Sequence, residues 1–258
     1  MQPPDPLPPA ASGRGRDWWL KGRIFAHRGL HGAHAPENSP TGFAAAIAQG
    51  LGIECDVRLS KDGRAVVFHD ERLERLTAAS GCVVDRSAED LAAIPLRGGA
   101  DRIPLLSDLL AQVAGAVPLL IEIKSSRGHA IAPLCAAVRG DLAGYAGQHA
   151  VMSFDPRVGA WFARHAPGTV RGLVVTEEGR RTLRHRIARH FALWRARAEF
   201  LAYDVRDLPS AFAAARRRRG LPVLAWTVRT AALRQIAALH ADAPIAEAEG
   251  LAHSHGNP

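Results

Sequence analysis

The sequence predicts an α/β protein of the TIM type: a (β/α)8 barrel with an irregular second-to-third strand connection and a small insertion. Short apolar runs rich in Val, Ile, Leu and Phe recur along the chain, and alanine-rich helical stretches separate most of them. The chain has 258 residues, 47% of them hydrophobic, which is enough for one such domain. A doubly wound sheet is the alternative, and the lack of a GxGxxG pattern after the first strand weakens it.

The predicted strands are short, continuous apolar runs, typical of parallel strands that are buried on both faces. They are Arg23–His27, Gly52–Val57, Ala65–His69, Pro118–Lys124, His149–Phe154, Val170–Val175, Phe200–Val205 and Pro222–Val228, with a weaker ninth candidate at Ala243–Ala246. The predicted helices between them are Pro40–Gln49, Leu105–Ala114, His129–Val138, Pro156–Arg164, Arg180–Ala198, Leu208–Arg218 and Thr230–Leu239. Ser39 suits the N-cap of the first helix, because Pro40 then takes the first helical position.

Two segments depart from a regular barrel. The stretch RLSKDGR is too short for a helical crossover, and Asp62-Gly63 is a turn signal, so the second and third strands are expected to join irregularly. Residues 71–104 lack periodicity and are interpreted as an insertion. Residues 1–15 are rich in proline and are expected to be disordered, which leaves a single barrel domain over residues 16–258.

The charge and cysteine content limit the classes of function. A net charge of +8 suggests acidic partners, yet only three of the 33 cations are lysine, which fits a coding bias toward arginine better than selection for nucleic-acid binding. With sparse aromatics and no nucleic-acid-binding motif, no nucleic-acid partner is expected. Three scattered cysteines indicate a reducing compartment, and no signal peptide or membrane span is visible, so a cytoplasmic location is expected.

Carboxylates interrupt two of the apolar strands. Glu54 and Asp56 lie two residues apart in GIECDVRL and therefore point to the same face, and Glu122 and Lys124 repeat this spacing in PLLIEIKSS. Two buried, unpaired carboxylates would repel one another, and a divalent cation would remove that cost. The alternatives are an acidic pair bridged by arginines and a buried Glu–Lys ion pair.

Imidazoles and cations follow other strands. The first strand ends in His27-Arg28-Gly29, and the third ends in His69-Asp70. Strand C-termini of a barrel meet on one face, where His27 and His69 would form an acid–base couple and Arg28 and Lys124 would face an anion. The set suits metal-assisted cleavage of a phosphodiester. His31 and His34 follow the turn at Gly29 and are either residues at the edge of the site or, preferably, ordinary loop residues.

These motifs resemble the glycerophosphodiester phosphodiesterase family. The resemblance rests on AHRG…PENS…IECDVRLSKDGRAVVFHDERLERLT, IPLLSDLL, IEIK, SF and WTV, which run from about Arg23 to Val228. It implies a TIM-type barrel that hydrolyses glycerophosphodiesters to glycerol 3-phosphate and an alcohol with one Mg2+ or Ca2+ ion. Implied roles are catalysis by His27 and His69, metal binding by Glu54, Asp56 and Glu122, and substrate binding by Arg28, Lys124 and Trp226. The insertion is typical of this family.

The sequence leaves several alternatives open. The region HADAPIAEAEG lacks the Thr-Asp pair that is common near the C-terminus of the family's sequences. How the barrel closes there, and which residues support the site from that region, are therefore not predicted. Lysophospholipase D or phosphoinositide-type cleavage, and a non-catalytic barrel that binds phosphodiesters, are alternatives. Trp18 and Trp19 lie among basic residues and suit either weak contact with a membrane surface or, preferably, packing under the barrel. The alcohol, the metal, the role of each histidine and the oligomeric state are not predicted.

Overall fold

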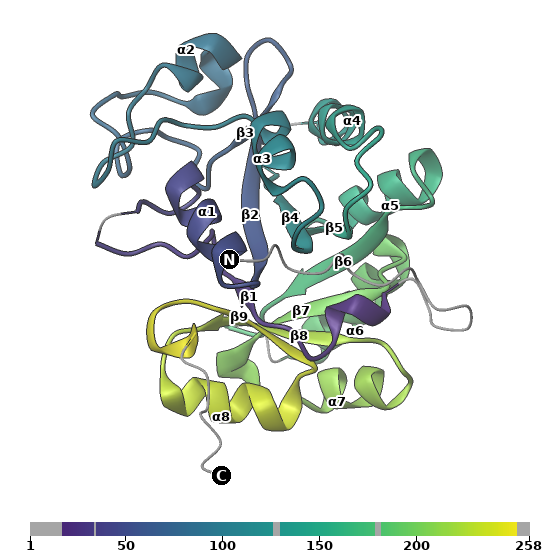
Figure 1. Ribbon diagram of the computed structural model, residues 1–258. Coiled ribbons are helices and arrows are strands. Elements are labelled where there is room, and N and C mark those ends of the chain that lie inside the picture. Colours follow the sequence, from purple (N-terminus) through teal and green to yellow (C-terminus); the bar gives the residue numbers. More distant parts are fainter. Residues whose placement is uncertain (1–16, 34, 126–129, 179–181, 252–258) are drawn as a thin grey trace.

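The computed structural model describes residues 17–33, 35–125, 130–178 and 182–251. In this part of the chain, parallel strands form a closed barrel (Figure 1), because β1 pairs with both β9 and β2. The eight barrel strands are β1 (Phe25–Ala26), β2 (Gly52–Leu59), β4 (Leu119–Ile123), β5 (His149–Ser153), β6 (Val170–Val175), β7 (Phe200–Asp204), β8 (Val223–Val228) and β9 (Ala243–Ala246). The predicted TIM-type barrel is confirmed.

The interpretation of residues 65–69 as a parallel strand was wrong. Strand β3 (Ala65–Val67) runs antiparallel to β2, with Val57 opposite Val67, and therefore lies outside the parallel barrel. The link from Leu59 to Ala65 is too short to cross the sheet, so the chain folds back as a hairpin. The weak ninth candidate, Ala243–Ala246, supplies the eighth parallel strand instead.

The helices surround the barrel as an outer ring in Figure 1. They are α1 (Pro40–Ala48), α3 (Leu106–Val113), α4 (Ala132–Asp141), α5 (Pro156–His165), α6 (Leu183–Ala196), α7 (Ala211–Arg218) and α8 (Ala231–His240). Helix α7 begins three residues later than predicted, because a 3-10 turn occupies Val205–Asp207 and the Ser210 side chain caps the helix at Ala213 N. Two helices were predicted to begin at His129 and at Arg180, and both of these residues lie outside the described residues.

Side chains that alternate along the strands fill the barrel interior. Phe25, Leu120, Met152, Phe200 and Leu224 are among those that pack there, while Cys55, Ile121 and their neighbours face the helices. A Cβ on Gly172 would come within 2.2 Å of the Phe200 ring, so the glycine provides room for that ring. The buried Trp19 packs edge-on against Phe25 with ring centroids 6.3 Å apart, as the packing interpretation of Trp18-Trp19 predicted.

Residues 71–104 form a small lobe beside the β2–β3 hairpin (Figure 1). It contains a 3-10 turn (Val83–Asp85) and helix α2 (Ala88–Ala92), and its apolar side chains pack on the hairpin in a cluster with Val66 and Phe68. The predicted disordered segment, residues 1–15, lies outside the described residues. Across the described ranges, the helices fall short of the length and apolar character needed to span a bilayer.

Candidate active site

Three carboxylates gather where β2 and β4 run side by side. Glu54 and Asp56 come from β2 and Glu122 from β4, with Asp56 directly opposite Glu122 in the strand register. Their relative exposures are 1%, 1% and 8%, and one ligand oxygen from each lies within 4.8 Å of the others. The period-two spacing on β2 and the pairing of β2 with β4 therefore bring together the three residues that the sequence singled out as metal ligands.

Burial and the neighbouring charges shift the pKa values of the carboxylates in this cluster. Burial raises the pKa of Glu54 well above its usual range, and the carboxylates of Asp56 and Glu122 raise it further. Burial also acts to raise the pKa of Asp56, but the charges of Lys124 and Arg28 outweigh it and lower that pKa. Lys124 Nζ lies 2.8 Å from Asp56 Oδ1 and 2.7 Å from Glu122 Oε1.

The donor set fits a hard divalent cation. It consists of carboxylate oxygens, the ligands that such ions prefer. Asp56 Oδ1 is buried and accepts no well-oriented hydrogen bond within the described residues, although the Lys124 ammonium is close to it. A cation would favour the ionised form of Glu54, which burial and its neighbours disfavour. The acidic cluster could therefore bind a divalent metal.

The turn after β1 holds Arg28 against this cluster. Arg28 has φ +56°, donates its backbone N–H to Glu54 Oε2 at 3.0 Å, and places Nε 3.1 Å from Asp56 Oδ2. Gly29 has φ +81°, and a Cβ there would meet the Phe43 ring at 2.9 Å, so this sharp turn requires glycine. Asn38 also holds Asp56, because its Nδ2 donates to the same Oδ2 oxygen at 2.9 Å.

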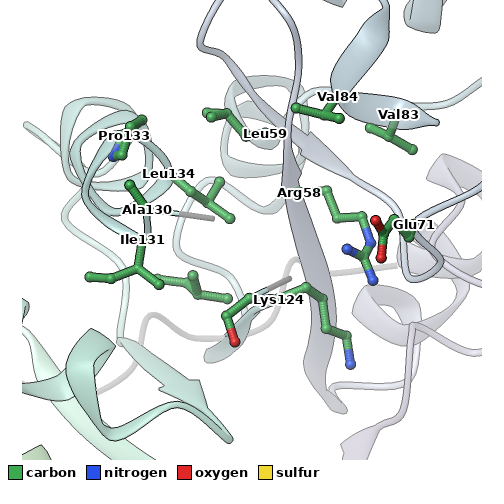
Figure 2. A pocket seen from close by; sticks show the side chains of 12 residues that line it. Arg58, Leu59, Glu71, Val83, Val84, Lys124, Ala130, Ile131, Pro133 and Leu134 are labelled. Carbon is green, nitrogen blue, oxygen red and sulfur yellow. The ribbon is translucent and has the colours of Figure 1, made fainter. Parts of the chain in front are cut away.

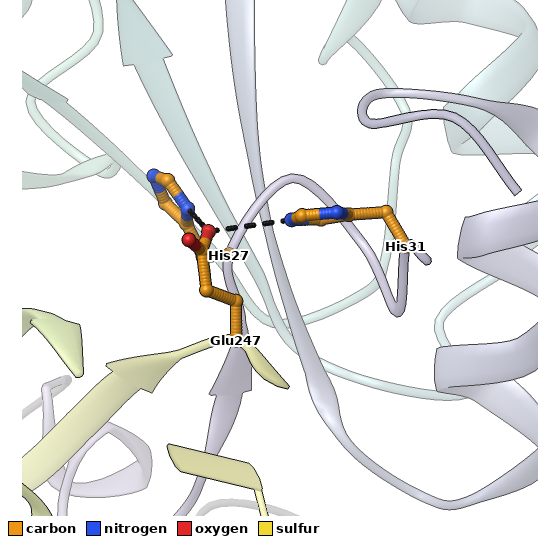
Figure 3. A group of neighbouring side chains, drawn as sticks. All are labelled: His27, His31 and Glu247. Atoms are coloured by element: carbon orange, nitrogen blue, oxygen red, sulfur yellow. Dashed lines mark hydrogen bonds and ion pairs between the residues drawn. The ribbon is translucent and has the colours of Figure 1, made fainter. Parts of the chain in front are cut away.

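His27 is held by a carboxylate that sequence reasoning missed. Its Nδ1 lies 2.5 Å from Oε2 of Glu247, which follows β9, and the same oxygen is 3.3 Å from His31 Nε2 (Figure 3). Burial lowers the pKa of His27, and the hydrogen bond that its Nδ1 donates to Glu247 opposes this effect. This region departs from the family pattern, so the sequence did not predict which of its residues supports the site. In the structure Glu247 takes that place, because it holds His27.

His69 likewise has a carboxylate at its Nδ1. The Nδ1 atom of His69 lies 2.6 Å from Asp70 Oδ1. Arg75 forms ion pairs with both Asp70 and Glu37, and Glu37 also pairs with the Arg28 guanidinium. Because β3 folds back along β2, Phe68 N donates to Asp56 O, which brings His69 beside the acidic cluster. Burial lowers the pKa of His69. In both histidines Nδ1 is engaged, so Nε2 is the nitrogen that can exchange a proton with a substrate.

Two aromatic rings, one on β8 and one directly after β5, meet although β6 and β7 separate these strands in the sheet. Trp226 on β8 donates Nε1–H to Ala202 O at 2.9 Å, which fixes its plane. The half-exposed Phe154, directly after β5, meets it edge-on with centroids 5.4 Å apart. Phe154 belongs to the SF motif, but it was not singled out from the sequence. The pair offers an apolar wall for a ligand's carbon skeleton.

An apolar pocket adjoins the charged cluster at Lys124. Its volume is about 270 Å3, and apolar side chains of β2, α4 and the 71–104 lobe line most of it. Figure 2 shows Leu59, Ile131, Leu134 and Val84 around this space, with Arg58 and Glu71 on the side of Lys124. The stem of Lys124 therefore lines the pocket, while its ammonium contacts Asp56 and Glu122.

The fold and this constellation define a class: a TIM barrel with buried carboxylates, carboxylate-bound imidazoles and cations, as a phosphodiester hydrolase requires. The family model described as the glycerophosphoryl diester phosphodiesterase family matches residues 27–246. The chain therefore belongs to that family.

Relatives and solved structures agree with this family. The glycerophosphodiester phosphodiesterase of Bacillus altitudinis is 42% identical over 113 residues, which are 40% of this chain and 44% of that protein. The match thus spans less than half of that relative's length. An Oleispira antarctica phosphodiesterase, solved with its product sn-glycerol-3-phosphate, is 23% identical, with a TM-score of 0.77 over 88% of this chain and 93% of that one.

A glycerophosphodiester phosphodiesterase from Thermotoga maritima has a TM-score of 0.70 at 24% identity, covering 86% of this chain and 93% of that one. At these identities the two structures show a shared fold. Together with the barrel closure described above, they place this chain among TIM-type barrels.

Proposed function

We propose that the chain hydrolyses glycerophosphodiesters to glycerol 3-phosphate and an alcohol, using one Mg2+ or Ca2+ ion. The observation that carries this proposal is the juxtaposition of the Glu54–Asp56–Glu122 cluster with two carboxylate-bound histidines. The family match supports the substrate class. The barrel domain predicted for residues 16–258 would act as one unit. Its three free cysteines support a cytoplasmic location, because disulfide bonds are rare in that reducing compartment.

In this proposal Glu54, Asp56 and Glu122 would hold the cation, which would supply positive charge to offset the negative charge of the phosphate. Arg28 and Lys124 would contact phosphate oxygens, since both cations already lie against the cluster. Trp226, with Phe154, packs on the glycerol carbons.

His27 and His69 transfer protons through Nε2. One deprotonates the nucleophile and the other protonates the leaving alcohol. Water as the nucleophile gives glycerol 3-phosphate directly, whereas the glycerol 2-hydroxyl gives a cyclic phosphate that water must then open to glycerol 3-phosphate. Glu247 and Asp70 hold the two rings in the required tautomer.

Release of glycerol 3-phosphate from glycerophosphocholine and glycerophosphoethanolamine tests the proposal. Wild-type protein with Mg2+ or Ca2+ should release it, while His27→Ala and His69→Ala should each lose ~10²–10⁴-fold in turnover. His240→Ala is a suitable control, since it lies at the end of α8. Near-wild-type rates in either site variant would remove that histidine from the mechanism. If the wild-type protein turns over no phosphodiester, the alternative of a barrel that binds phosphodiesters without cleaving them would stand instead.

The apolar pocket at Lys124 favours a second candidate, the lysophospholipase D type of reaction. An acyl chain bound among Leu59, Ile131 and Leu134 would extend from a phosphate that contacts Lys124. Each buried methylene contributes ~0.8 kcal/mol, so kcat/KM should rise about twofold to fourfold per methylene in a series of short-chain lysophosphatidylcholines.

Val84→Asp, which places a charge at the pocket wall, should abolish that rise and leave glycerophosphocholine turnover unchanged. A kcat/KM that does not change with chain length in the wild type would rule out this use of the pocket.

A further inference from the structure

Helix α6 carries an apolar stripe on its outer face. Leu183, Ile187, Phe191 and Trp194, here called the α6 stripe, have relative exposures of 69%, 61%, 56% and 72%. At about 100° per residue their positions fall within an arc of about 80°. The rings of Phe191 and Trp194 lie in contact, with centroids 5.6 Å apart. Isolated exposed apolar residues are common, but a contiguous line of four is typical of an interaction surface.

Cations flank the α6 stripe on both sides. At the same angular spacing, Arg184 and Arg195 lie along one edge and Arg186 along the other, and all three are exposed. Helix α6 itself has no acidic residue, and the described residues place no carboxylate in an ion pair with any of these three arginines. The nearby Glu177 and Glu178 pair with other arginines. The surface is thus apolar at its centre and positive at its rims.

The opposite face of α6 is anchored on the barrel, so the stripe is presented by a fixed helix. Ala196 is buried, Leu193 packs on the core beside it, and Arg189 reaches Glu177 at 3.3 Å. The helix ends at Ala196, and the C-cap residue Arg197 has φ +47°. Opening of the helix is therefore not needed to expose the four side chains.

We propose that the α6 stripe docks the protein on the surface of an anionic lipid bilayer. The apolar side chains would enter the boundary between headgroups and acyl chains, and the flanking arginines would meet lipid phosphates. A second copy of the chain suits this face less well, because symmetric pairing would bring two rows of unpaired arginines together. The Trp18-Trp19 pair does not compete for this role, since Trp19 is buried under the barrel. The proposal does not depend on the hydrolytic activity.

Sedimentation of the full chain with vesicles tests this proposal. Wild-type protein should bind vesicles of phosphatidylcholine mixed with phosphatidylglycerol, and bind weakly to phosphatidylcholine alone. Phe191→Ser/Trp194→Ser should weaken binding at least ~tenfold through lost apolar burial. Arg184→Gln/Arg195→Gln should weaken it ~25-fold in low salt, at about fivefold for each cation, and much less in high salt.

Matched controls separate docking from general effects of the substitutions. Leu239→Ser removes an apolar side chain on α8 that is also 72% exposed, and Arg64→Gln/Arg97→Gln removes two exposed charges far along the chain from α6. Both should bind vesicles as the wild type does, and thermal melts should show all variants folded. Absence of wild-type binding, or equal loss in the controls, would overturn the proposal. So would a dimer in light scattering that the Phe191→Ser/Trp194→Ser variant dissociates, since the stripe would then be a subunit interface.

Discussion

Glu247→Gln is the substitution that tests the support of His27 most sharply. The glutamine keeps the size of the side chain and can still accept a hydrogen bond, but the negative charge 2.5 Å from His27 Nδ1 is lost. A charge-assisted hydrogen bond contributes about 1.5–3 kcal/mol. If that stabilisation is expressed in the transition state, turnover should fall by roughly 10- to 150-fold, at 1.4 kcal/mol for each factor of ten.

The pH profile distinguishes a positioning role from a loss of structure. Burial lowers the pKa of His27, and the hydrogen bond and charge of Glu247 act to raise it. Without that charge the pKa of His27 should fall further. The limb of the kcat/KM profile that reports His27 should therefore move to lower pH, whether the ring acts as acid or as base.

The assay is glycerol 3-phosphate release as a function of pH, with Glu249→Gln as the control. Glu249 is exposed and lies two residues beyond Glu247, so it shares the segment but not the contact. Wild-type turnover with an unshifted profile in Glu247→Gln would refute the assignment. Equal loss in Glu249→Gln would indicate a general disturbance of the segment after β9.

Three further predictions follow from the site and the core. Glu122→Gln should weaken Mg2+ or Ca2+ binding at least ~tenfold in calorimetric titration, because a carboxylate ligand is lost; unchanged affinity would mean that the ion binds elsewhere. Asp70→Asn should lower turnover ~10- to 100-fold with little change in metal affinity, since Asp70 contacts His69 and not the cluster; a change in affinity alone would contradict this role. Gly172→Ala should lower the free energy of unfolding by about 1–3 kcal/mol in urea titrations, because its Cβ would overlap the Phe200 ring; wild-type stability would show that the ring can move aside.

The residues at strand ends were predictable because strand alternation is a local property. Glu54 and Asp56 share a face whatever the rest of the fold does, and so do Glu122 and Lys124. The register that sets Asp56 opposite Glu122 comes from the direct pairing of β2 with β4, which was not predicted from the sequence because Ala65–His69 was expected to lie between them. Local pattern and the barrel rule were therefore sufficient to predict that the three carboxylates gather at one face, while their role as metal ligands stays a prediction.

The direction of β3 and the role of Glu247 were not predictable in the same way. An apolar triplet such as Ala65–Val67 suits a parallel or an antiparallel strand equally, and the short turn before it gave the one available signal. Glu247 lies 220 residues from His27 in the sequence, and nothing in AEAEG distinguishes it from Glu249. Its contact depends on closure of β9 against β1, which is a property of the whole barrel.

Phosphorus NMR of glycerophosphocholine incubated with the protein tests the central claim most directly. The account predicts that the diester signal is replaced by that of glycerol 3-phosphate when Mg2+ or Ca2+ is present, and that EDTA or the Glu54→Ala substitution stops the conversion. A diester signal that persists with either metal, or its replacement by phosphocholine, would contradict the claim.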